Sequence, residues 1–205
     1  MLKLYFSPGS CARASHIILE ETGAPYQAEK ISFADNQQRS PEFLKINPKG
    51  RVPALVTPHG ILTESPAILA YVAQIHPEAK LAPTDPFEFA QAQSFNSYIC
   101  STVHVAHAHK FRGARWADDP AAIEAMKAKV PESVGAAFAL IEEGMLKGPW
   151  VLGDQYSICD AYLFTVSSWL EGDGVDLAKL PKVMAHRQRV ADRPATKSVL
   201  LAEKA

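Results

Sequence analysis

The stretch ALVTPHGILTESP, residues 54–66, decides the fold, because a turn separates two short apolar runs and a helix start follows them. The runs at residues 54–56 and 61–63 have the length and composition of β-strands. The turn between them, residues 57–60, contains a proline and a glycine, so we expect a hairpin and an antiparallel pair. Ser65 is a good N-cap, and the proline after it falls at the first helical position, where a missing N–H is harmless. The stretch therefore predicts two strands followed by a helix.

The residues before this stretch alternate strand and helix. Residues 3–6 predict a short buried strand, and we expect a helix over residues 11–22 with Ser10 as its N-cap. Residues 27–32 predict a second strand. Two strands joined by a helix on this scale imply a parallel pair in a right-handed βαβ unit. The first domain, residues 1–80, is therefore expected to hold a mixed four-stranded α/β sheet in the order βαβ-ββα.

A polar, proline-bearing break at residues 81–86 separates this sheet from a second part that lacks strand alternation. This second domain, residues 87–205, is expected to be an all-α helical bundle. Its long helices are expected at residues 87–115, 120–147, 157–171, 181–192 and 194–203. The chain should therefore have two domains of different class.

The composition is that of an ordinary globular protein, with 47% hydrophobic and 21% charged residues. A formal net charge of −1 gives no reason to expect nucleic acid or a membrane as a partner. The first residues turn polar too soon for a signal peptide, and no apolar run approaches the roughly 18 residues of a membrane span. The three cysteines are widely spaced without a CxxC pair, which argues against disulfides and zinc. We therefore expect a cytoplasmic protein.

Cys11 is the first candidate for chemistry. It lies at an expected helix start, where unpaired N–H groups and the helix dipole favour an anion, so its pKa is predicted to be lowered. Arg13, two residues further on, could add to this effect. The alternative is a buried cysteine that acts as a small apolar residue. Cys100 and Cys159 fall in apolar helical sequence and are expected to be structural.

Two further stretches of the first domain suggest a binding site for a peptide-like ligand. A cis bond between Val52 and Pro53 would expose the backbone N–H and C=O of Val52 to such a ligand; a trans turn is the alternative. Glu64 and Ser65 combine a carboxylate, a hydroxyl and a helix start, which suits the zwitterionic end of an amino acid. The alternative is that these residues only cap the helix and bind no ligand.

A polar stripe is expected on the first helix of the second domain. Ser97, Ser101, His104 and Ala108 are spaced to share one face, which suggests a wet cleft against the first domain. His104 and its neighbouring histidines could also be interpreted as metal ligands. Without cysteines or carboxylates at ligand spacing, no metal site is expected, and His107 and His109 are expected to be surface or satisfied histidines.

Taken together, these stretches resemble the glutathione transferases over essentially the whole chain, most closely the bacterial beta class. The resemblance rests on four motifs in family order: YFSPGSC at residues 5–11, INPKGRVP at 46–53, LTES at 62–65 and DAYLF at 160–164. It implies a thioredoxin-like domain followed by a helical bundle, and a homodimer in which the first domain of one chain packs on the helical domain of the other.

The resemblance also implies roles for single residues. Val52 would bind the cysteinyl backbone of glutathione, and Glu64 with Ser65 its γ-glutamyl end. Cys11 would face the glutathione sulfur, with His104 close to it and Ser101 on the same helical face. Ser157 and Asp160 match a capping box that serves folding.

Two positions depart from the family pattern. A lysine that often follows the second strand is missing, and Asn36 or Arg39 could replace it. Ser97 stands where an asparagine is often found, and it could still donate a hydrogen bond.

The expected function is conjugation of reduced glutathione to small hydrophobic electrophiles, with glutathione as cosubstrate and no cofactor. Helical side chains such as Phe111 and Trp116 would form the electrophile pocket, and Tyr5 or Ser7 are fallback hydroxyls near the sulfur. Two alternatives stay open. One is a glutaredoxin-like thiol–disulfide exchanger that uses Cys11. The other is a non-catalytic protein that binds glutathione or hydrophobic ligands.

Overall fold

Four strands form one mixed sheet in the computed structural model, which describes residues 1–204. Their order is β2-β1-β3-β4, with β1 at Leu2–Phe6, β2 at Tyr26–Lys30, β3 at Ala54–Thr57 and β4 at Gly60–Thr63. β1 pairs in parallel with β2 and antiparallel with β3, and β3 pairs antiparallel with β4. The mixed sheet and its βαβ-ββα order are as predicted.

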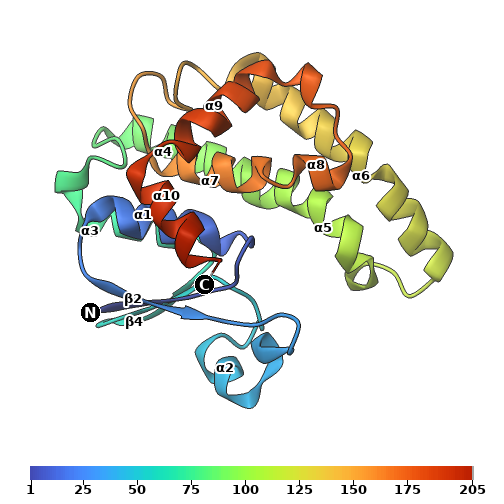
Figure 1. Ribbon diagram of the computed structural model, residues 1–205, viewed down its shortest axis with the longest axis horizontal. Coiled ribbons are helices and arrows are strands. Elements are labelled where there is room, and N and C mark those ends of the chain that lie inside the picture. Colours follow the sequence, from blue (N-terminus) through green and yellow to red (C-terminus); the bar gives the residue numbers. More distant parts are fainter. Residues whose placement is uncertain (205) are drawn as a thin grey trace.

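Three helices accompany this sheet. α1 (Ala12–Thr22) connects β1 to β2, α2 (Pro41–Ile46) precedes β3, and α3 (Ser65–Ile75) follows β4. α1 and α3 lie between the sheet and the helical part, whereas α2 lies on the other side of the sheet (Figure 1). The contacts between the first domain and the helical part are therefore made largely by α1 and α3.

The start of α3 differs from the prediction, because Glu64 and not Ser65 is its N-cap. The carbonyl of Glu64 accepts the first helical hydrogen bond, from the Ile68 N–H at 3.1 Å, which defines the N-cap position. Glu64 has φ = 73°, a value that only a few per cent of non-glycine residues adopt. This backbone turns the chain sharply from β4 into α3 and makes Ser65 the first helical residue.

The helical part contains the expected helices, but three of them change pitch or break. Its elements are α4 (Pro86–Tyr98), a π-helical segment (Ile99–Val103), α5 (His104–Arg112), a 3₁₀ turn (Gly113–Arg115), α6 (Pro120–Leu140), a second π-helical segment (Ile141–Met145), α7 (Ile158–Ser167), α8 (Leu170–Asp173), α9 (Pro181–Ala191) and α10 (Pro194–Ala202). Asp85 and Asp119 cap α4 and α6 by accepting hydrogen bonds from backbone N–H groups. No helix within residues 1–204 is both long and apolar enough to cross a membrane.

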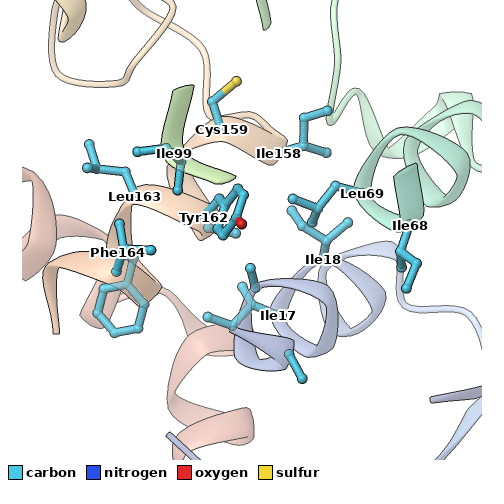
Figure 2. Close-up of a cluster of buried hydrophobic side chains, with 14 of the residues drawn as sticks. Ile17, Ile18, Ile68, Leu69, Ile99, Ile158, Cys159, Tyr162, Leu163 and Phe164 are labelled. Atoms are coloured by element: carbon cyan, nitrogen blue, oxygen red, sulfur yellow. The ribbon is translucent and has the colours of Figure 1, made fainter. Parts of the chain in front are cut away.

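One hydrophobic core runs through both parts of the chain. Figure 2 shows Tyr162 of α7 beside Ile17 and Ile18 of α1, with Leu69 of α3 close by. These side chains are 1% exposed or less. The predicted break at residues 81–86 lies between α3 and α4; as a boundary between folding units it stays a prediction, because the core continues across it.

The predicted capping box at the start of α7 is confirmed. The Ser157 hydroxyl accepts from the Cys159 N–H at 3.3 Å, and the Asp160 carboxylate accepts from the Ser157 N–H at 2.7 Å. Asp160 is completely buried, so this cap belongs to the core and not to the surface.

Candidate functional site

A cavity of about 640 Å³ lies at the junction of the two parts, which is within the usual size of a small-molecule site. Its walls come from the loop after β1, the segment before β3, the start of α3, and α5 with the turn after it. Cys11, Val52, Glu64, Ser65 and His104 all line it. The structure thus brings together five of the seven residues that the sequence suggested for the site.

Ser97 and Ser101 are exposed and do not line this cavity, so the expected polar stripe is wrong for these two serines, whereas its other members, His104 and Ala108, do line the cavity. The π-helical segment Ile99–Val103 explains the difference. Each π-turn holds about one residue more than an α-turn, which rotates the face that follows it. The Ser101 hydroxyl donates instead to the Ser97 carbonyl at 2.8 Å, while His104 alone of the three faces the cavity.

The environment of Cys11 contradicts the predicted low pKa. Cys11 occupies the N-cap of α1, but its side chain makes no capping hydrogen bond and donates to the Val52 carbonyl at 3.4 Å. Burial raises the pKa of Cys11 to about 11, and this effect outweighs a hydrogen bond from Ser65, which lowers the pKa. The Glu64 carboxylate raises the pKa further. Desolvation therefore wins over the helix start, and the thiol is protonated near pH 7.

Arg13 does not assist Cys11, because it is committed to the end of the chain. Its guanidinium forms an ion pair with Glu203, with Nη2 at 2.6 Å from the carboxylate, and donates to the Ser168 hydroxyl at 3.1 Å. The same carboxylate accepts from the Gly9 N–H at 3.1 Å. The arginine thus fixes the loop before Cys11 and leaves the thiol without a cationic neighbour from α1.

The segment before β3 has a fixed backbone at the cavity wall. The Val52–Pro53 bond is cis, which the sequence left open. Buried Asn47 donates through its amide to the Arg51 carbonyl at 2.6 Å and accepts from the Lys49 N–H at 3.2 Å. Gly50 has φ = 59°, and a Cβ there would come within 2.9 Å of the Gln38 carbonyl, so only glycine fits. These contacts hold Val52 beside the cavity.

The Glu64 carboxylate already has a cationic partner, because Lys49 forms an ion pair with it. The Lys49 ammonium also donates to the Thr63 hydroxyl at 2.7 Å. An arriving ammonium would share the carboxylate with this lysine. The pair also bears on the lysine that this chain lacks after β2. Asn36 and Arg39, the expected replacements, do not line the cavity, whereas Lys49 is paired with Glu64, which does.

His104 is held as a neutral imidazole. Burial, together with the nearby charges of His107 and Arg112, lowers the pKa of His104 to about 4. Its ring lies 5.1 Å from the ring of Trp169, centroid to centroid. Near pH 7 the side chain therefore offers one N–H donor and one acceptor at the cavity wall, and no charge.

His107 is a cavity residue that the sequence reasoning missed. It was expected to be a surface or satisfied histidine, and its Nδ1 is indeed satisfied by the buried Asp173 carboxylate, at 2.8 Å. Its ring stacks on Trp169 at 4.3 Å, and the Trp169 indole N–H donates to the Gly9 carbonyl at 2.9 Å. No local pattern could reveal this arrangement, because Asp173 is 66 residues away along the chain.

Within residues 1–204, no group of three His, Cys, Asp or Glu side chains is arranged to hold a metal ion. All three cysteines are free thiols. The cavity wall offers neutral hydrogen-bond donors, backbone N–H and C=O groups, the Glu64 carboxylate, and the exposed arginines Arg51, Arg112 and Arg115.

Both parts of the chain match models of known protein families. Residues 1–74 match the family model for the glutathione S-transferase N-terminal domain, and residues 95–194 match that for the C-terminal domain. Glutathione S-transferase GstA of Escherichia coli O157:H7 is 31% identical over 98% of each chain. Disulfide-bond oxidoreductase YfcG of Escherichia coli K12 is 28% identical, over 98% of this chain and 95% of the relative.

Solved structures agree with these matches. A glutathione transferase homologue from Sulfitobacter with bound glutathione has a TM-score of 0.94 at 48% identity, covering 97% of this chain and 96% of the other. A beta-class glutathione S-transferase of Sphingomonas chungbukensis has a TM-score of 0.85 at 35% identity, covering 98% of each chain. The expected thioredoxin-like domain followed by a helical domain is therefore confirmed.

Proposed function

Because the chain belongs to the glutathione S-transferase family, we propose that it transfers reduced glutathione to small electrophiles with a hydrophobic body, as a member of the bacterial beta class. The observation that carries this proposal is the meeting of Cys11, Val52 and Ser65 at one cavity. A tripeptide could lie there with its backbone along Val52 and its γ-glutamyl carboxylate at the start of α3. The exposed rings of Phe111 and Trp116 supply apolar surface for the electrophile at the other end.

The proposed mechanism uses neutral donors around the glutathione sulfur. With a pKa of about 11, the Cys11 thiol keeps its proton at pH 7 and can donate it in a hydrogen bond to a glutathione thiolate. His104, neutral because its pKa is about 4, can donate its ring N–H to the same sulfur. Donors fixed before the reaction stabilise the thiolate without reorganisation, and the thiolate then attacks the electrophile. No metal or nucleotide takes part in this proposal.

Thiol–disulfide exchange through Cys11 is the second candidate, favoured by the likeness to a disulfide-bond oxidoreductase. The raised pKa of Cys11 acts against it, because only the thiolate attacks a disulfide. We therefore place conjugation first. The free thiols suit a reducing compartment, and we propose the cytoplasm as the site of action.

The test begins with retention on immobilised glutathione and elution by free glutathione. A panel of electrophiles that includes a nitroaromatic halide follows, and a glutathione mixed disulfide is assayed in parallel. Retention with turnover of the halide supports the transferase. Turnover of the mixed disulfide only would favour the exchanger, and retention without either reaction would leave a binding protein.

Replacing His104 with alanine is expected to lower kcat about tenfold or more while the Kd for glutathione changes less than threefold. The reason is that a donor to the sulfur favours the thiolate form of bound glutathione, so its loss lowers the fraction that can attack, while the backbone contacts that bind glutathione remain. Steady-state kinetics and glutathione titration give the two values. Between pH 6 and 8 the wild-type kcat should show no ionisation of His104, since its pKa of about 4 lies below this range.

His59→Ala, in the exposed turn of the β3–β4 hairpin, is the matched control and should keep the parental kcat. If His104→Ala has parental turnover, His104 does not act at the sulfur. If glutathione binding falls as much as kcat, the residue serves binding and not the reaction.

We further propose a two-fold homodimer in which the first domain of one chain packs on the helical domain of the other. The exposed Ile61 on β4 and Phe87 on α4 would be covered by such an interface. Ser97 and Ser101 lie outside their own cavity, so a glutathione contact by them is proposed only across this interface. Light scattering at micromolar concentration should give twice the mass of one chain, and Phe87→Ser should weaken the dimer. A monomeric mass for the parent would contradict the proposal.

A further inference from the structure

We propose that the electrophile carries a carboxylate, and that Arg112 and Arg115 at the mouth of the cavity bind it; this inference rests on the transferase function proposed above. Arg112 ends α5, and Arg115 ends the 3₁₀ turn that follows. Both line the cavity from the helical part, on the side where the electrophile is expected. The inference restricts the proposed class of hydrophobic electrophiles to those with an apolar body and an anionic end.

The arginines of the cavity lack carboxylate partners of their own. Within residues 1–204, arginine ion pairs are made by Arg13, Arg187 and Arg193, none of which lines the cavity. Glu64 is the one acidic side chain on the cavity wall among these residues, and Lys49 is paired with it. The cavity mouth therefore carries a positive charge that only a ligand or solvent can compensate.

The guanidinium groups lie close enough to repel one another. Burial and the charges of Arg112, Arg51 and Arg39 lower the pKa of Arg115. The charges of Arg112 and Arg115 also help to lower the pKa of His104, after burial and His107. Since His104 is neutral and adds no charge, an anion placed among these arginines would relieve their mutual repulsion.

Glutathione does not account for all of this charge. Its γ-glutamyl carboxylate is expected at the start of α3, and its ammonium group at Glu64. Its glycyl carboxylate needs a single cation, for which Arg51 of the first domain is suitably placed in the segment before Val52. Arg112 and Arg115 remain, and both come from the helical part.

The neighbours of these two arginines suit an aromatic acid. The Arg112 guanidinium lies 5.7 Å from the ring centroid of Phe33, so it reaches across the cavity toward the first part of the chain. Phe111 and Trp116, beside the two arginines in sequence, are 76% and 47% exposed. A planar apolar body can pack on these rings while its carboxylate meets a guanidinium group.

The test uses two glutathione conjugates that differ by one charge. S-(4-carboxybenzyl)glutathione and S-(4-carbamoylbenzyl)glutathione have the same shape, and their binding needs no catalytic turnover. Isothermal titration should show the carboxylate conjugate binding about tenfold more tightly at low ionic strength, and salt should reduce this preference. In the double variant Arg112→Gln/Arg115→Gln the preference should vanish, while the affinity for the amide conjugate stays within about threefold.

Arg189→Gln is the matched control, because it removes one guanidinium from α9, outside the cavity, and should keep the preference. Equal binding of the two conjugates by the parent, or a preference that survives in the double variant, overturns the inference. The single variants give the same comparison should the double variant unfold. Failure of glutathione itself to bind would instead overturn the proposed function, and the inference with it.

Discussion

Asp160→Asn is expected to lower the free energy of unfolding by about 3–5 kcal/mol, the range found when one partner of a buried charged network is removed. The Asp160 carboxylate is completely buried and accepts four hydrogen bonds. They come from the Val151 N–H at 2.7 Å, the Ser157 N–H at 2.7 Å, the Ser157 hydroxyl at 3.0 Å and His186 Nε2 at 2.8 Å. An asparagine amide would turn its own N–H₂ toward these donors and leave at least one of them unsatisfied.

Urea unfolding at a fixed protein concentration measures this loss, since an oligomer would make stability depend on concentration. Asp119→Asn is the matched control. Asp119 caps α6 at an exposed position, and asparagine caps a helix about as well as aspartate, so its effect should stay below about 0.5 kcal/mol. A loss of less than 1 kcal/mol for Asp160→Asn would show that the network is not needed for the fold.

Local signals explain why so much of the fold could be predicted. The hairpin of residues 54–63 and the capping box at Ser157 depend on residues within a few positions of one another, and both are found in the structure. The hydrogen bond between Asp160 and His186 could not be predicted in this way, because His186 lies 26 residues beyond Asp160. The prediction was correct for the cap but could not anticipate the buried network around it.

The candidate site was harder to predict, because its properties depend on long-range packing. Arg13 was expected to act on Cys11, but its partner Glu203 is 190 residues away. Ser97 and Ser101 fit an α-helical stripe, and the π-helical segment that removes them from the cavity has no recognisable sequence pattern. The spacing of residues in the sequence therefore predicted the cavity residues of the first domain better than those of the helical part.

The same limit applies to the charge state of Cys11. From its position at a helix start the sequence predicts a thiolate, whereas burial raises the pKa to about 11. Both effects are real, and their balance depends on how much water reaches the sulfur. Only the packed structure, with the thiol against the Val52 carbonyl, decides which is larger.

The largest rate change that we expect concerns alkylation of Cys11 by iodoacetamide. With a pKa of about 11, the thiolate fraction should be about one in 10⁴ at pH 7 and one in ten at pH 10. The rate should therefore rise about a thousandfold over this interval and still be rising at its end. A cysteine with the ordinary pKa of about 8.5 would gain only about thirtyfold and level off. Peptide mass mapping separates Cys11 from Cys100, and Cys159 should stay unmodified because it is completely buried.

Two neighbours of the sulfur should move this profile in opposite directions. Glu64→Gln removes a carboxylate that raises the pKa of Cys11, so the rise should begin at lower pH. Ser65→Ala removes a hydrogen bond that lowers this pKa, so the rise should begin at higher pH. A general loss of structure cannot produce shifts of opposite sign, which makes each variant the control of the other. A parental rate that levels off near pH 8 would contradict the raised pKa. It would also return Cys11 to the thiol–disulfide exchange that its burial now disfavours, because glutathione disulfide would then meet a thiolate at neutral pH.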